Sequence, residues 1–174
     1  MIIGVTGYIG AGKTDFANFL EREYGFSSGS FGGVVRDEAQ RRSLPMDRAS
    51  LQRLGYELKK ERGQTELAQR IIGTLNLSGR YNYVINGFRS KWDVLPFDKL
   101  QNFTLVGINA SFGVRCERVL LRRAPGDPET REQFKDADYR DRGILKGDFY
   151  QNSDECLKLA KFKINNDGSI LYFN

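Results

Sequence analysis

The sequence of 174 residues contains no histidine and only two cysteines. Without histidine the chain cannot build a Ser-His-Asp triad, a His-ligated zinc site or an imidazole general base, so carboxylates must carry any proton transfer. Cys116 and Cys156 are too few for a disulfide framework and are not spaced as metal ligands, which favours a reducing cytoplasm. No apolar run approaches the ~20 residues of a membrane span, and no secretory signal is recognisable, so we expect no membrane partner.

The composition that remains is typical of one compact domain. Hydrophobic side chains make up 40% of the chain and charged ones 28%, which is enough for a core and excludes the disordered class. Because no repeat, low-complexity tract or long linker divides the chain, we treat residues 1–174 as a single domain. Twenty-seven basic residues against 22 acidic ones give a net charge of +5, which is compatible with phosphate-bearing ligands such as nucleotides.

Apolar patterns predict alternating strands and helices. The predicted strands cover residues 1–6, 26–31, 81–85, 103–110 and 161–165, and the predicted helices cover 13–24, 34–42, 47–62, 65–75, 114–123 and 153–160. Residues 90–100 carry a proline and mixed polarity and receive no assignment. The alternation predicts an α/β fold with a parallel sheet that helices cover on both faces.

The segment Gly7-Tyr8-Ile9-Gly10-Ala11-Gly12-Lys13-Thr14 follows the pattern Gly, four residues, Gly-Lys-Thr, between a predicted strand and a predicted helix. Its glycines let the backbone curl so that successive N–H groups point at phosphate oxygens, and the helix N-terminus adds partial positive charge. We therefore expect this backbone to bind the phosphates of ATP. Lys13 is expected to bridge the β- and γ-phosphates during catalysis, and the Thr14 hydroxyl to ligate Mg²⁺.

With this loop, further segments resemble the P-loop nucleotide kinases, the group that contains nucleoside monophosphate kinases and dephospho-CoA kinase. The matching segments are residues 34–39, 51–63 with 67–70, 84–89, 115–123 and 163–168. The resemblance implies a P-loop NTPase three-layer sandwich, with about five parallel strands between helices. It also implies a helical acceptor-binding arm over residues 34–75 and a lid over residues 124–147. The lid segment is dense in charge and glycine, so a solvated loop with helical turns is the alternative.

The resemblance implies that Arg36 and Arg89 bind the phosphate of the acceptor. Arginine suits this role because its planar guanidinium pairs bidentately with phosphate and keeps its charge. A simple surface ion pair is the alternative for each of them. Asp37, next to Arg36, is the carboxylate that could contact the acceptor on this side.

Three arginines of the predicted helix 114–123, Arg115, Arg118 and Arg122, are spaced at i, i+3 and i+7, which predicts a cationic stripe on one face. The resemblance implies that Arg118 and Arg122 neutralise charge in the transition state. Arg131 and Arg140 are weaker candidates from the lid. Ion pairing with Glu117 and neighbouring acids is the alternative.

Two positions depart from the family pattern. Asn86 stands where relatives have Asp, and Gly32-Gly33 stands where they have Ser-Asp. The missing carboxylates normally hold Mg²⁺ and position the acceptor hydroxyl, and Asp37 or Asp15 could replace them. Phosphoryl transfer depends mostly on positioning and charge stabilisation, so catalysis can survive their loss. The resemblance also places Asn166 near the adenine of the donor, although its segment is equally typical of a simple turn.

The sequence therefore predicts a cytoplasmic, ATP- and Mg²⁺-dependent kinase that acts on a small phosphate-bearing acceptor, a nucleoside or deoxynucleoside monophosphate. Dephospho-CoA kinase is an alternative within the same enzyme class. A catalytically weakened nucleotide-binding protein is a second alternative, suggested by Asn86 and Gly33. A polynucleotide or DNA-base kinase is a third, suggested by the positive charge. The acceptor and the oligomeric state stay open.

Overall fold

The sheet at the centre of the molecule has five strands, and eight helices surround it in the computed structural model, which describes residues 1–75, 81–144 and 151–168. The strands are β1 (Ile2–Gly7), β2 (Ser27–Ser30), β3 (Tyr83–Phe88), β4 (Phe103–Asn109) and β5 (Phe162–Asn165). The helices are α1 (Lys13–Tyr24), α2 (Phe31–Arg41), α3 (Arg48–Arg62), α4 (Glu66–Thr74), α5 (Lys91–Asp98), α6 (Phe112–Arg122), α7 (Arg131–Arg142) and α8 (Ser153–Leu159).

The strands lie in the order β2-β3-β1-β4-β5, and every pair is parallel. The first strand is therefore central, with Val5 paired to Asn86 on one side and to Val106 on the other. Because the strands are parallel, their carboxyl ends meet at one edge of the sheet, and the loop after β1 opens there. The predicted α/β P-loop fold is confirmed.

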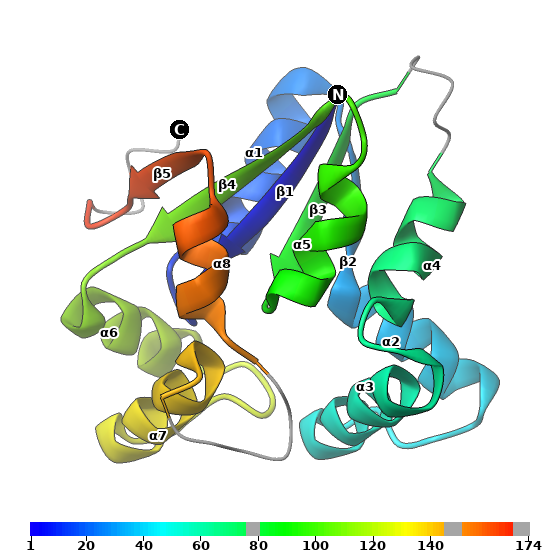
Figure 1. Ribbon diagram of the computed structural model, residues 1–174. Coiled ribbons are helices and arrows are strands. Elements are labelled where there is room, and N and C mark those ends of the chain that lie inside the picture. Colours follow the sequence, from blue (N-terminus) through cyan, green and yellow to red (C-terminus); the bar gives the residue numbers. More distant parts are fainter. Residues whose placement is uncertain (76–80, 145–150, 169–174) are drawn as a thin grey trace.

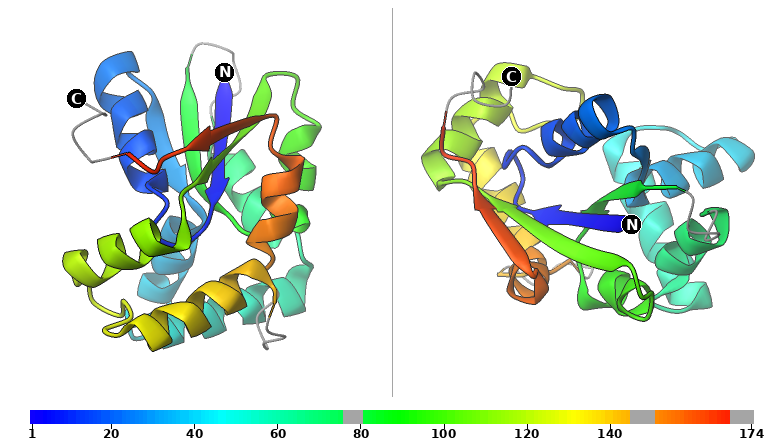
Figure 2. Two further views of the ribbon diagram at one scale, coloured as in Figure 1. Left: turned by 90° about the vertical axis from the view of Figure 1, so that its left-hand side faces the viewer. Right: turned by 90° about the horizontal axis from the view of Figure 1, so that it is seen from above.

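Neighbouring residues of each strand supply opposite faces of the sheet, as the two-residue period of a strand requires. Val84 and Val106 pack with Leu20 of α1, whereas Ile85 and Leu105 belong to a second cluster on the other face. That second cluster includes buried residues of α2, α3, α4, α5 and α8. Figures 1 and 2 show α1 on one side of the sheet and α5 and α8 on the other, so three layers form.

Two predicted boundaries are wrong near the site. Helix α2 begins at Phe31 rather than residue 34, because the Ser30 side chain accepts a hydrogen bond from the Gly33 N–H and caps the helix early. Strand β3 continues to Phe88 rather than ending at residue 85, through a register shift against β1 and a positive φ of 97° at Gly87. Asn86 therefore lies within a strand of the sheet.

Helix α5 occupies the segment that received no assignment. A capping box between Ser90 and Asp93 starts the helix, and Pro96 lies inside it. Helix α7 occupies much of the expected lid, where Thr130 and Gln133 form a second capping box and Phe134 is buried. Residues 145–147 of that expected lid lie outside the described residues. No helix among residues 1–75, 81–144 and 151–168 is long and apolar enough to cross a bilayer.

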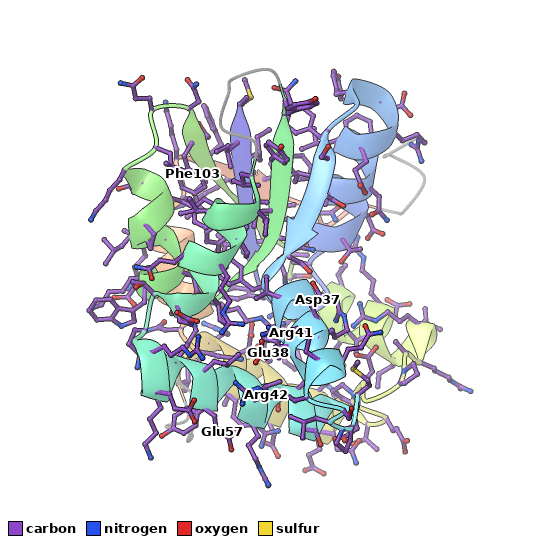
Figure 3. All side chains as sticks on the ribbon, turned by 90° about the vertical axis from the view of Figure 1, so that its right-hand side faces the viewer. Asp37, Glu38, Arg41, Arg42, Glu57 and Phe103 are labelled. Atoms are coloured by element: carbon purple, nitrogen blue, oxygen red, sulfur yellow. The ribbon has the colours of Figure 1, made fainter. Side chains whose placement is uncertain are left out.

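Helices α2, α3 and α4 occupy most of the segment expected to form the acceptor-binding arm, and we call these three helices the arm; they lie on the β2 side of the sheet in Figure 1. Buried Glu38 of α2 accepts hydrogen bonds from Arg41 and Arg42 and, across the arm, from Arg70 of α4 at 2.8 Å. Figure 3 shows the first two of these arginines beside the carboxylate. The network joins α2 to α4 through a buried carboxylate whose negative charge is compensated by arginine side chains.

Candidate functional site

A single cleft of about 1150 Å³ runs from the loop after β1 to the arm. Its walls include five residues that the sequence singled out: Lys13, Thr14, Arg36, Asp37 and Arg89. Three elements position them, since the first two residues begin α1, the next two lie in α2 and the last follows β3. The fold thus brings together the expected donor and acceptor groups from distant parts of the chain.

The loop from Gly7 to Thr14 has a conformation that side chains would prevent. Gly12 caps α1 with φ at 96°, and a Cβ there would collide with the Asn166 amide nitrogen. Gly10 has φ at 77°, and its missing Cβ leaves room for the backbone of α6. The Ile9 and Ala11 side chains are buried in the core, so only their backbone groups can contact a phosphate.

The Lys13 ammonium folds back onto its own loop. Its Nζ donates hydrogen bonds of 2.7 Å to the carbonyl oxygens of Gly7 and Tyr8. Burial lowers the pKa of Lys13 to about 8, and the negative charge of Asp141 opposes that effect. A phosphate beside this ammonium would stabilise its charge, so the loop favours an anion.

Thr14 and Asn86 meet at the junction of α1 and β3. The Asn86 amide nitrogen lies 3.4 Å from the Thr14 hydroxyl oxygen. The Asn86 Oδ1 atom is buried and has no hydrogen-bond partner among the described residues. Two oxygens, a hydroxyl and an amide carbonyl, thus suit a cation such as Mg²⁺, which keeps its other positions for water and phosphate. The described residues contain no cluster of three acidic or cysteine ligands. The phosphates of the nucleotide would therefore supply much of the negative charge that binds the cation.

Arg89, which the resemblance assigns to the acceptor phosphate, lines the cleft. Its Nη1 lies 3.5 Å from Asp141 Oδ1 and 3.4 Å from Gln151 Oε1, which orients a guanidinium that is 37% exposed. Arg36 is exposed on α2, and its guanidinium lies over Gly32 at the start of the same helix. Both arginines can turn N–H groups into the cleft.

Two carboxylates that could replace the missing acids lie on different sides of the site. Asp37 lines the cleft beside Arg36 and is exposed. Asp15 is exposed in the first turn of α1, and its charge acts on Arg122. Of the two, Asp37 lines the cleft that contains Arg36 and Arg89, and Asp15 does not.

The three arginines of α6 do not form the expected cationic stripe. Arg115 is buried and pairs with buried Asp138 of α7. Arg118 donates to the Gly168 carbonyl at 2.7 Å. Arg122 pairs with Asp127 at 2.6 Å rather than with Glu117, and this hydrogen bond raises the pKa of the guanidinium. Only Arg122 among the three lines the cleft.

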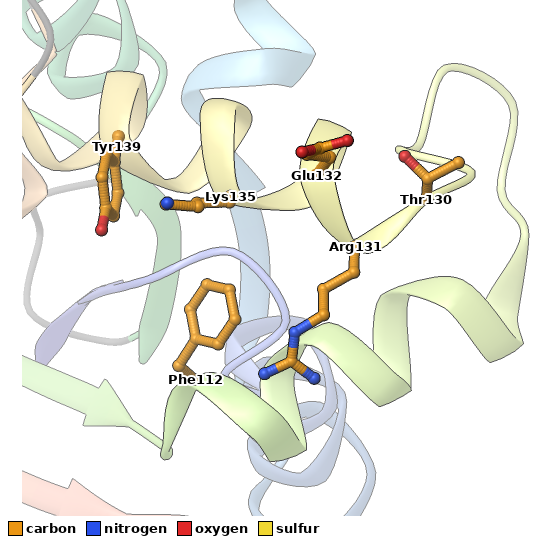
Figure 4. Close-up of a pocket in the computed structure, with 6 residues that line it drawn as sticks. All are labelled: Phe112, Thr130, Arg131, Glu132, Lys135 and Tyr139. Carbon is orange, nitrogen blue, oxygen red and sulfur yellow. The ribbon is translucent and has the colours of Figure 1, made fainter.

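The weaker lid candidates lie elsewhere. Arg131 lines a second hollow of about 620 Å³ between α6 and α7, where its guanidinium lies 5.4 Å from the centre of the Phe112 ring. Figure 4 shows this hollow with Lys135 and Tyr139 at its other end. Arg140 is exposed on α7. Neither arginine is part of the cleft wall that contains Lys13.

Asn166 packs against the loop from Gly7 to Thr14, which we call the phosphate loop. It is 8% exposed, and its amide donates a 3.0 Å hydrogen bond to the Ala11 carbonyl. The next residue, Asp167, accepts a hydrogen bond from the backbone N–H of Ser111, which lowers the pKa of the carboxyl. The loop after β5 is thus tied to both the phosphate loop and the start of α6.

Sequence reasoning missed several residues at the site because their partners are distant in the chain. Lys59 of α3 pairs with Asp93 of α5 at 2.7 Å, and both line the cleft. Tyr8 and Arg115 contact each other behind the phosphate loop. Tyr8 occupies a variable position of the loop pattern, so no local signal marks it. A buried arginine such as Arg115 has the same appearance in the sequence as an exposed one.

The sequence matches one family model and several curated proteins. A family model described as AAA domain (AAA_17) matches residues 6–136. A UPF0200 protein of Hyperthermus butylicus is 32% identical over 157 residues, which cover 90% of this chain and 84% of that protein. UPF0200 protein TK1334 of Thermococcus kodakarensis is 31% identical over 146 residues, covering 81% and 78%.

Solved structures agree on the fold. TT1252 from Thermus thermophilus superposes with a TM-score of 0.63 at 19% identity, over 99% of this chain and 92% of that one. Shikimate kinase from Bacteroides thetaiotaomicron superposes with a TM-score of 0.60 at 15% identity and the same coverage. At these identities the likeness establishes the fold alone.

Proposed function

Because the chain belongs to the AAA-domain family AAA_17 and to the UPF0200 family, we propose that it is an ATP- and Mg²⁺-dependent kinase acting on a nucleoside or deoxynucleoside monophosphate. The observation that carries this proposal is the cleft itself. One continuous cavity joins Lys13 and Thr14 of the phosphate loop to Arg36 of the arm and to Arg89 after β3. Two anionic groups could therefore bind at its two ends, as transfer between a triphosphate and a monophosphate requires.

At the donor end, backbone N–H groups of the loop would hold the β- and γ-phosphates, and Lys13 would exchange its two carbonyl partners for phosphate oxygens. Thr14 and Asn86 would hold Mg²⁺, which neutralises phosphate charge when it is bound. Arg122, which lines the cleft, would exchange its pairing with Asp127 for the transferring group.

At the acceptor end, Arg89 would bind the acceptor phosphate while Asp141 and Gln151 hold its guanidinium in place. Arg36 would contact the same phosphate from α2. Asp37 would accept a hydrogen bond from the acceptor or remove its proton, a role that positioning can make unnecessary.

Dephospho-CoA kinase is a second candidate because the arm side of the cleft contains several apolar side chains. Its wall there includes Met46, Leu51, Leu67, Ile71 and Leu75. Such a surface can bury either a nucleobase or a longer pantetheine chain. The two buried free cysteines, Cys116 and Cys156, are compatible with a reducing cytoplasm in either case.

The test is an acceptor screen with ATP and Mg²⁺ that follows ADP release. The panel contains the common ribo- and deoxynucleoside monophosphates and dephospho-CoA, and Lys13→Met, which should be much less active, is the comparison variant. We expect turnover with at least one monophosphate. Turnover with dephospho-CoA alone would establish the second candidate.

Tight ATP binding without turnover on any acceptor would contradict the proposal and favour the non-catalytic alternative. Asn86→Asp would then show whether the missing acid limits transfer. DNA binding that weakens steeply with salt, together with phosphate transfer to DNA, would instead establish the polynucleotide alternative.

A further inference from the structure

The Tyr8 side chain lies behind the phosphate loop rather than in the cleft. Its ring is half-buried, and two guanidinium groups lie over it, those of Arg115 in α6 and Arg142 in α7. Each guanidinium carbon is 4.8 Å from the ring centre. At this distance a cation is attracted to the ring, so two helices hold one residue of the loop.

Polar contacts also connect Tyr8 and Arg142 to Asp154 of α8. Arg142 donates hydrogen bonds of 2.9 Å and 3.3 Å to the two carboxylate oxygens of Asp154 in α8. Burial, and then a hydrogen bond to Asp154, raises the pKa of Tyr8 to about 12. The phenol is therefore neutral near pH 7 and stays a hydrogen-bond donor to the α8 carboxylate.

The backbone of the same residue contacts the reactive end of the loop. The Tyr8 carbonyl accepts a 2.7 Å hydrogen bond from Lys13 Nζ. Arg115, which lies over the Tyr8 ring, also donates to the adjacent Ile9 carbonyl at 3.2 Å. A displacement of the ring would therefore move the carbonyl that orients the Lys13 ammonium.

We propose that Tyr8 is a positioning residue for the donor nucleotide, since its ring fixes the phosphate loop against α6 and α7 and thereby orients Lys13. This inference rests on the proposed function, because it concerns the same donor site. It assigns α7 a role other than that of a mobile lid: its carboxyl end supports the loop through Arg142. Lys13 alone would then be insufficient for full nucleotide affinity.

The test uses the full chain and the non-hydrolysable ATP analogue AMP-PNP with Mg²⁺, with affinity measured by calorimetry. Tyr8→Leu removes the ring, Tyr8→Phe removes only the hydroxyl, and Tyr24→Leu removes an exposed tyrosine of α1 as the matched control. We expect Tyr8→Leu to weaken binding about tenfold or more, since two cation–π contacts are lost. Tyr8→Phe should stay within about threefold of the unmodified chain, because the ring remains.

A double-mutant cycle separates positioning from general destabilisation. Arg142→Met should also weaken binding, and its combination with Tyr8→Leu should lose less affinity than the sum of the two single changes. Urea unfolding of each variant identifies the fraction that is folded, and Arg142→Met supplies the answer if Tyr8→Leu does not fold. Additive losses, or unchanged affinity in folded Tyr8→Leu, would overturn the positioning role. Absence of AMP-PNP binding in the unmodified chain would instead refute the proposed function.

Discussion

Lys13 is the residue on which the proposed chemistry depends most directly. Lys13→Met keeps the length of the side chain and removes its charge, so we expect turnover to fall by about 10²–10³, the usual effect of losing one transition-state donor. Burial already lowers the pKa of Lys13, so the charged amine does not stabilise the fold. The urea midpoint at pH 7 should therefore not decrease.

The measurements for this variant are ADP release and urea unfolding by circular dichroism. Lys60→Met is the control, because Lys60 is exposed on α3 and does not line the cleft. Full turnover in Lys13→Met would show that phosphate transfer does not need the Lys13 ammonium.

Gly12 is a second residue whose replacement separates the loop from the rest of the fold. Gly12→Ala would place a Cβ against the Asn166 amide at φ 96°, a conformation that costs about 1–3 kcal/mol for residues with side chains. We expect AMP-PNP affinity to fall and the free energy of unfolding to decrease by that amount. Gly73→Ala is the control, since α4 leaves open space there and alanine should stabilise the helix by about 0.5–1 kcal/mol. Equal behaviour of the two variants would contradict the crowding at the loop.

The Tyr8 phenol gives a pH-dependent prediction. Its pKa is about 12 in the folded chain, above the value near 10 that an unfolded chain would have. Between these values the unfolded state releases the proton while the folded state keeps it, so the free energy of unfolding falls as pH rises. Tyr8→Phe lacks this ionisation and should lose less stability between pH 10 and pH 12. Parallel pH profiles from urea unfolding would show that Tyr8 is not the group responsible.

Helices α6 and α7 are joined by a buried ion pair. Arg115 is 2% exposed and Asp138 is completely buried, so neither charge can be hydrated if its partner is lost. Asp138→Asn should lower the free energy of unfolding by about 3–5 kcal/mol, because the buried guanidinium then lacks its counter-charge. Asp136→Asn on the exposed face of α7 should change stability by less than about 0.5 kcal/mol. Similar effects of the two substitutions in denaturant titrations would contradict the importance of the pair.

The secondary structure was predictable where local patterns agree with packing. Helix α1 begins at Lys13 and ends before Gly25, which adopts the left-handed conformation that the sequence suggested for a helix end. Helix α5 was missed because Pro96 lies inside it, although its first-turn capping box overcomes that signal. Helix α7 was misread because Asp138 is buried rather than solvated. Burial of a charge depends on a partner in another helix, which a local pattern does not contain.

Sequence reasoning could predict the part of the candidate site that lies within one short segment. The loop from Gly7 to Thr14 could be identified because its pattern is local, and the arginines of the cleft wall followed from resemblance. The support behind the loop could not be predicted, because Tyr8 contacts Arg142 through the fold of the whole chain. The order of the strands could not be predicted for the same reason, because β1 pairs with β3 and β4, which are distant from it in the chain.

At the scale of the molecule, the cleft lies between the sheet edge and the arm, so a nucleotide bound there would contact parts of the chain that separate on unfolding. Binding to the folded state alone adds about 2.7 kcal/mol of stability at a ligand concentration of 100 times Kd. For a chain of this size, that should raise Tm by about 5–11 °C with Mg²⁺ and AMP-PNP. Lys13→Met should show a much smaller shift at the same concentration. A thermal shift of equal size in both proteins would mean that the nucleotide binds outside the phosphate loop.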